Sequence, residues 1–171
     1  THHGREYKLR HKHTNTHTHT WVGRDKKEVW HRSDGSGGDV ANLTTFVNNG
    51  GTLIAMRPDA QLASLLGITP AGSTLSDAYL QVNTSGGGAG AGIVGSTIQY
   101  HGKADLYTLT GGTGSTALAT LYSNASTPTA YPAVTTRDVG SNGGQAIAFM
   151  YDLAKSVIYT RQGNPTWAGQ K

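Results

Sequence analysis

Residues 38–67 constrain the fold of this chain more than any other stretch. Asp39 is suited to cap a helix, and apolar residues then recur at helical spacing as far as Val47. Gly50-Gly51 would end that helix, because glycine enters the left-handed conformation of a helix terminus without steric cost. The pattern therefore predicts an amphipathic helix that is closed by a glycine turn.

A strand and a second helix are predicted directly after this turn. Residues 52–56 are nearly all apolar, and their length and flanks favour a strand buried on both faces. Arg57-Pro58 ends the strand, and Asp59 is placed to cap a helix at 60–66. A buried strand between two helices is typical of a layered α/β sheet. The loop 57–59 would then lie at the carboxyl end of a strand, where open α/β folds bind ligands.

Length and composition exclude several classes of protein. A chain of 171 residues is the size of one domain, and no apolar run in it is long enough for a membrane span. It has no cysteine, which excludes disulfides, thiolate metal sites and a cysteine nucleophile. Residues 1–37 carry eight of the 14 Lys/Arg and four of the 10 Asp/Glu, so the remainder is neutral. The basic balance describes this leader and gives no reason to expect a nucleic-acid partner.

The leader, residues 1–37, differs in kind from the rest of the chain, residues 38–171. It holds seven of the eight histidines and no sustained hydrophobic period, so we expect disorder or loose packing there. One interpretation is a cloning-derived or mis-started sequence joined to a natural domain. A second is metal capture, and a third is a nucleic-acid-binding arm. The candidate metal ligands are His11, His13, His17 and His19.

The second half of the chain is predicted to be rich in strands. Residues 68–76 are expected to form a connector and 85–92 a glycine-rich surface loop rather than a phosphate-binding loop. The clearest hairpin joins 133–139 to 145–151 through a glycine turn. Residues 153–160 fit either a helix or an extended segment. The remaining strand candidates are residues 78–82, 93–98, 103–109 and 117–122, with a turn at 111–114 between the last two.

Several short motifs together resemble class I glutamine-amidotransferase-like domains, of the kind found in multidomain secreted bacterial proteins. They are, in order, residues 46–59 (FVNNGGTLIAMRPD), 104–107 (ADLY), 117–122 (ALATLY), 132–134 (PAV) and 140–149 (GSNGGQAIAF). The resemblance covers about residues 40–165; trehalose-utilisation-like domains and the β-galactosidase middle domain are more distant relatives. It implies a flavodoxin-like layered sheet with helices, incomplete here, and additional antiparallel strands in the C-terminal half.

The departures from this family bear on chemistry. Such domains begin with further strand–helix units, and the leader does not look like them, so the domain is expected to be truncated on its N-terminal side. Met56-Arg57-Pro58 occupies the turn that holds the family's cysteine nucleophile, and Asp152 stands where a histidine would end the late strand. The amidotransferase reaction is therefore not carried over, and fold alone does not fix function.

Few side chains in residues 38–171 are candidates for chemistry. His101 and Asp152 are the catalytic candidates, although a histidine before glycine also suits a turn and an aspartate after a strand also suits a cap. Arg57 and Asp59 are candidate ligand-binding residues; the alternatives are an ion pair between them and an N-cap role for Asp59. Arg161-Gln162 could either line a site or dock on a neighbouring domain. Asp105 is a further carboxylate with an equally good capping interpretation.

The leading functional hypothesis is a non-catalytic accessory or interaction domain of a larger, carbohydrate-related extracellular bacterial protein. Its partner would be the remainder of a larger polypeptide or another protein domain, with carbohydrate as an alternative and nucleic acid disfavoured. No cofactor is expected, and the extracellular location follows from the resemblance alone. The alternatives are a hydrolase that brings Arg57, His101 and Asp152 into one cleft, and metal binding through the leader.

Overall fold

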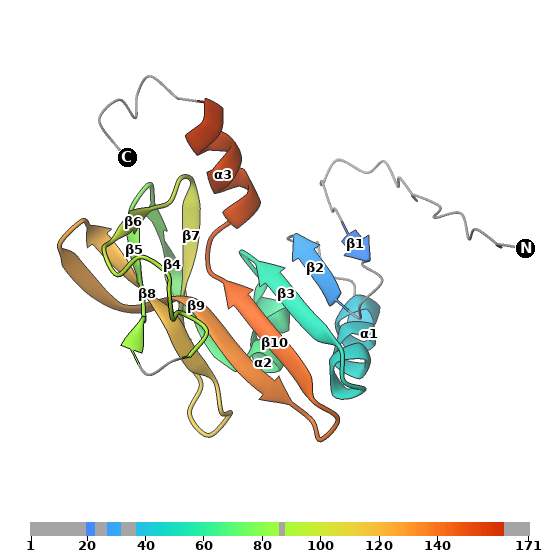
Figure 1. Ribbon diagram of the computed structural model, residues 1–171. Helices are drawn as coiled ribbons and strands as arrows, with labels where there is room; N and C mark the ends of the chain where they lie inside the picture. Colours follow the sequence, from blue (N-terminus) through green and yellow to red (C-terminus); the bar gives the residue numbers. More distant parts are fainter. Residues whose placement is uncertain (1–19, 23–26, 32–36, 86–87, 163–171) are drawn as a thin grey trace, which may run out of the picture.

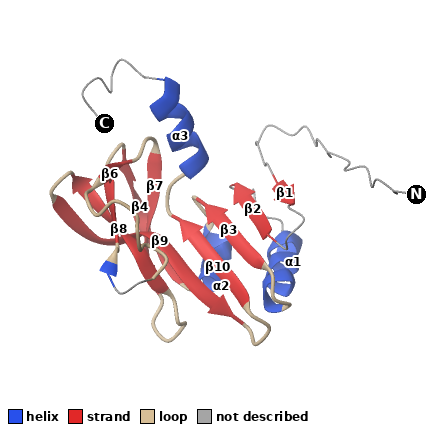
Figure 2. Cartoon of the chain, viewed as in Figure 1, coloured by secondary structure: helices blue, strands red, loops and turns tan. Residues whose placement is uncertain are grey.

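The computed structural model describes residues 20–22, 27–31, 37–85 and 88–162 of the chain (Figure 1). Helices and strands alternate at first, and strands dominate afterwards (Figure 2). In chain order the elements are β1 (Thr20–Val22), β2 (Lys27–His31), α1 (Gly37–Asn48), β3 (Thr52–Met56), the 3-10 helix η1 (Ala60–Leu62), α2 (Ala63–Leu66), β4 (Ile68–Ser76), β5 (Tyr79–Val82), β6 (Ile98–Gln99), β7 (Lys103–Leu109), β8 (Thr116–Asn124), β9 (Thr127–Val139), β10 (Gly144–Phe149) and α3 (Leu153–Gln162).

The main sheet has eight strands in the order β1-β2-β3-β10-β9-β8-β5-β6 within the described residues, and β4 pairs with β7 in a second sheet. Only β2, β3 and β10 run parallel; the other pairs are antiparallel. The expected α/β class is confirmed, but the flavodoxin-like layered sheet is wrong. A parallel layered sheet needs a helical crossover between successive strands, whereas short turns join β8 to β9 and β9 to β10. The main sheet instead curls into a half-barrel (Figure 1).

The stretch predicted most firmly forms the expected elements. Helix α1 precedes β3 but begins at Gly37, so Asp39 lies in its first turn and is not the predicted N-cap. The next helix begins as η1 and continues as α2. The Asp59 carboxylate accepts the backbone N–H of Gln61 at 2.9 Å, so Asp59 is the predicted N-cap. Gly67 ends α2 with a φ of 66°. In β3 only Leu53 and Ala55 are fully buried, so one face of this strand, rather than both, is sealed from water.

Two predicted segments have a different structure. The expected connector at 68–76 is strand β4, which pairs with β7 and bulges between Pro70 and Thr74 because proline and glycine interrupt the ladder. Of the expected strand at 93–98 only its last residue is in a strand, β6. The open choice at 153–160 is settled as helix, α3. The turn at 111–114 does join β7 to β8, but these strands belong to different sheets.

Part of the leader belongs to the main sheet. Strand β2 pairs in parallel with β3, and β1 pairs with β2 at the sheet edge. Residues 20–22 and 27–31 thus pair with the sheet, and the expected disorder or loose packing of residues 1–37 stays a prediction. The remaining residues of the leader, with His11, His13, His17 and His19, lie outside the described residues. The division at residue 37 stays a prediction.

Strand β10 separates two hydrophobic cores, because successive side chains of a strand point to opposite faces. Ala146 and Ala148 face the first core, which α1, α2, β3 and β4 complete. Ile147 and Phe149 face the second core, which is built from β5, β8 and β9. Helix α3 begins just after β10 and lies at one end of the curled sheet (Figure 1). In the described part of the chain, no helix has the length and apolar character that crossing a membrane requires.

Candidate functional site

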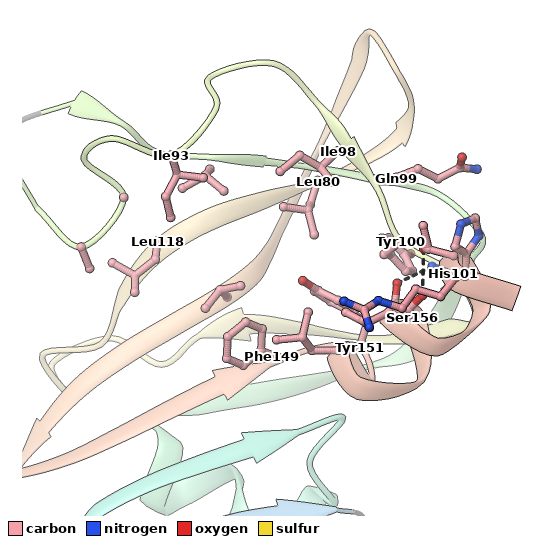
Figure 3. Close-up of a pocket in the computed structure, with 18 residues that line it drawn as sticks. Leu80, Ile93, Ile98, Gln99, Tyr100, His101, Leu118, Phe149, Tyr151 and Ser156 are labelled. Carbon is pink, nitrogen blue, oxygen red and sulfur yellow. Dashed lines mark hydrogen bonds between the residues drawn. The ribbon is translucent and has the colours of Figure 1, made fainter. Parts of the chain in front are cut away.

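The candidate site is a cavity of about 540 Å³ between the β5–β6 edge of the sheet and helix α3 (Figure 3). Strands, a loop and one face of the helix all contribute to its wall. The lining residues are Leu80, Val82, Ala89, Gly90, Ile93, Ile98, Gln99, Tyr100, His101, Leu118, Val134, Phe149, Tyr151, Leu153, Ser156, Val157, Thr160 and Arg161.

Aromatic rings form one side of the cavity. Tyr100 and Tyr151 stack with their ring centroids 5.0 Å apart, and Phe149 meets Tyr151 edge-on at 6.0 Å. Burial raises the pKa of Tyr151 to about 12. The pKa of Tyr100 lies still further above its usual range, because of burial first and then the nearby Asp77 carboxylate and Tyr151. Both tyrosines are therefore neutral at physiological pH, and this wall carries no charge.

A hydrogen bond ties helix α3 to the cavity wall. The backbone N–H of His101 donates to the Ser156 hydroxyl at 2.9 Å, and both residues are buried (Figure 3). Asp152 caps the start of this helix, since its carboxylate accepts the backbone N–H of Lys155 at 2.8 Å. Leu153 and Val157 are then four residues apart on one helical face, and both line the cavity. Local capping and helical spacing thus place the helical wall.

Arg57 forms a structural ion pair outside the cavity. Its guanidinium donates from Nε and from one terminal nitrogen to the Asp105 carboxylate, at 2.9 and 3.0 Å. Its backbone lies at a φ of 48°, and its N–H donates to the Phe149 carbonyl at 2.7 Å. The alternative of an ion pair with Asp59 is therefore wrong, because Asp59 is used as a helix cap. The pair joins β3 to β7 and so connects the two sheets.

Arg57→Gln is expected to lower the free energy of unfolding by about 1 to 2 kcal/mol, because it leaves a half-buried carboxylate without its bidentate partner. Urea unfolding measures the loss. The matched controls are Asp105→Asn and the double variant. If the two side chains act as a pair, the sum of the losses in the two single variants exceeds the loss in the double variant. Strictly additive losses would contradict the structural role of this pair.

The predicted hydrolase residues do not meet in the cavity. Of Arg57, His101 and Asp152, only His101 is among the residues that line it. Asp59 does not line it either, whereas Arg161 does, and the side chain of Gln162 lies outside the described part of the chain. In the described part of the chain, no group of three or more His, Asp or Glu side chains could hold a metal ion. The ligand-binding role of Arg161 stays a prediction, now with a defined location.

Sequence reasoning missed most of the cavity wall. The sequence pattern places Tyr100, Phe149 and Tyr151 only in strands or a loop, and the apolar spacing of Leu153 and Val157 on α3 does not by itself indicate a cavity. The alternation of Phe149 with Tyr151 at the end of a strand was the available signal. It did not point to a cavity, because the facing residues come from β5 and β6, far away in the sequence.

No family model matches the chain, and no curated protein matches it. Among solved structures it is similar to the exo-β-1,4-mannosidase Op5Man5 from Opitutaceae bacterium strain TAV5, at 16% identity and a TM-score of 0.52 over 77% of this chain and 21% of that one. It is also similar to a β-galactosidase from Bacillus circulans sp. alkalophilus, at 13% identity and a TM-score of 0.50 over 75% of this chain and 21% of that one. The cytoplasmic protein STM1381 from Salmonella typhimurium LT2 gives 12% identity and a TM-score of 0.51 over 78% and 61%.

These matches correct the family assignment. The chain spans about a fifth of the length of the mannosidase and of the β-galactosidase that it matches, and identities this low show likeness of fold alone. They do not support a glutamine-amidotransferase or flavodoxin-like domain, so that resemblance is wrong. The motifs behind it describe a helix, a glycine turn, a strand and a late hairpin. Such local elements recur in many α/β folds and do not identify a family.

Proposed function

We propose that this chain is a non-catalytic accessory domain of a larger, carbohydrate-related protein. The fold resembles about a fifth of the length of an exo-β-1,4-mannosidase and of a β-galactosidase, two proteins named for acting on carbohydrates. A domain of this size within such a protein would act by contact with the remainder of the polypeptide.

The observation that carries the proposal is the separation of the carboxylates from the cavity. Glycoside hydrolysis ordinarily uses two carboxyl groups that flank the scissile bond. Here five acidic side chains of the described residues have structural partners: Asp59 and Asp152 cap helices, and Asp105 pairs with Arg57. Asp77 accepts the Gly102 N–H, and Asp138 accepts the Gln145 amide. None of these carboxylates lines the cavity.

The experiment compares wild type and His101→Ala in hydrolysis of p-nitrophenyl β-galactoside and β-mannoside. We expect release of p-nitrophenol by both proteins to equal the buffer rate, because none of the five carboxylates named above lines the cavity. Native-state content of both samples is checked by near-UV circular dichroism. Turnover by the wild-type chain that His101→Ala abolishes would overturn the proposal and favour the hydrolase alternative.

A further inference from the structure

We propose that the cavity between β5, β6 and α3 binds a small amphipathic anion: an aryl or alkyl carboxylate whose apolar body lies among the aromatic rings while its carboxylate contacts Arg161. This goes beyond the accessory role proposed above, and either one can hold without the other. Three properties of the cavity carry it: its size, the chemistry of its wall, and the sign of its charge.

The size of the cavity fits a small organic molecule. Its volume of about 540 Å³ lies within the roughly 300–1,000 Å³ typical of ligand pockets. Such pockets have mostly apolar walls with a few polar groups that fix orientation. Here Leu80, Phe149 and Tyr151 belong to the apolar part, and the buried His101–Ser156 hydrogen bond marks one polar end (Figure 3).

The mouth of the cavity is itself apolar. Ile93, Ile98 and Val157 line the cavity, yet each is between 39% and 48% exposed. Large aliphatic side chains gathered at the mouth of a cavity are a feature of binding sites. An apolar ligand body that covers them removes their surface from water, which favours binding by about 25 cal/mol for each Å² buried.

Charge selects the head group of the ligand. Arg161 is the permanently charged residue among those that line the cavity, and no aspartate or glutamate of the described residues lines it. Within the described residues Arg161 has no acidic partner. A guanidinium binds carboxylates through paired, charge-assisted hydrogen bonds. The cavity therefore favours an anion over a neutral or cationic molecule with the same apolar body.

The test uses three probes in which a phenyl ring carries a four-carbon chain that ends in a carboxylate, a hydroxyl or an amine: 4-phenylbutyrate, 4-phenylbutanol and 4-phenylbutylamine. Isothermal titration calorimetry of the full chain measures each affinity. We expect the carboxylate to bind about tenfold more tightly than the alcohol, and the amine to bind most weakly. Arg161→Gln should abolish the preference for the carboxylate and leave the alcohol's affinity unchanged. Val157→Ser should lower the affinities for the carboxylate and for the alcohol alike, because it removes apolar contact.

The matched control is Lys155→Gln, which removes one positive charge from the same helix. Lys155 is exposed, lies over the Tyr159 ring and does not line the cavity, so this variant should bind the carboxylate as wild type does. Each of three outcomes would overturn the proposal. The first is equal affinity for all three probes, and the second is an Arg161→Gln variant that still prefers the carboxylate. The third is a loss of carboxylate affinity in Lys155→Gln equal to that in Arg161→Gln. Absence of saturable binding by any probe would also overturn it and would leave the apolar mouth to a protein partner. None of these outcomes bears on glycoside turnover, so the two proposals fail separately.

Discussion

Gly144→Ala is expected to lower the free energy of unfolding by about 3 kcal/mol, because a methyl group there would overlap the backbone carbonyl oxygen of Val47. Gly144 is the first residue of β10, and Val47 lies near the end of α1. The absence of a side chain at Gly144 thus lets the helix lie directly on the strand. Because the obstacle is backbone, relief requires a shift of the whole helix rather than a change of one rotamer.

Urea unfolding followed by far-UV circular dichroism measures this loss. The matched control is Gly143→Ala, one residue earlier, where an added methyl group meets nothing within 4 Å. Gly143 has a φ of 76°, so alanine there costs about 1 to 2 kcal/mol through backbone strain alone. If Gly144→Ala were no more destabilising than Gly143→Ala, the close packing of α1 on β10 would be contradicted.

Alkaline pH is expected to destabilise the fold through Tyr151. In the folded chain burial raises its pKa to about 12, against about 10 for an exposed tyrosine. Below pH 10 both the folded and the unfolded chain keep the Tyr151 proton, so this residue contributes nothing to the pH dependence of stability there. Between pH 10 and 12 the unfolded chain releases the proton more readily, and stability falls as pH rises. The pKa of Tyr151 differs by about two units between the folded and the unfolded chain. The free energy of unfolding therefore falls by about 1.4 kcal/mol by pH 11, and by nearly twice that above pH 12.

Tyr151→Phe isolates this effect. No hydrogen bond of the Tyr151 hydroxyl is found within the described residues, so the variant removes the titrating group with little change in packing. The free energy of unfolding of wild type and variant is compared by urea titration at pH 8, 9, 10 and 11. The variant should lose about 1.4 kcal/mol less than wild type between pH 8 and 11. Parallel losses in the two proteins would show that Tyr151 is not responsible.

The sequence predicted the candidate site only at single positions. Arg161 was identified as a candidate ligand-binding residue and does line the cavity, and His101 was identified as a candidate and lies in its wall. Their neighbours could not be predicted, because β6, β10 and α3 meet only after the sheet has curled. Arg57 shows the same limit: its position after β3 was predicted, but its partner is Asp105, 48 residues away, and not the adjacent Asp59.

The sequence by itself determined the local elements: helix α1 with its glycine turn, strand β3, the Asp59 cap and the β9–β10 hairpin. Each depends on interactions between residues close together in the chain, such as helical spacing, side-chain caps and glycine conformation. Only the tertiary structure decided that β2 pairs with β3, that β7 pairs with β4, and that α3 closes a cavity against β5 and β6. Backbone hydrogen-bonding groups are the same in every strand, so partners are chosen by the burial of side chains that come from distant parts of the chain.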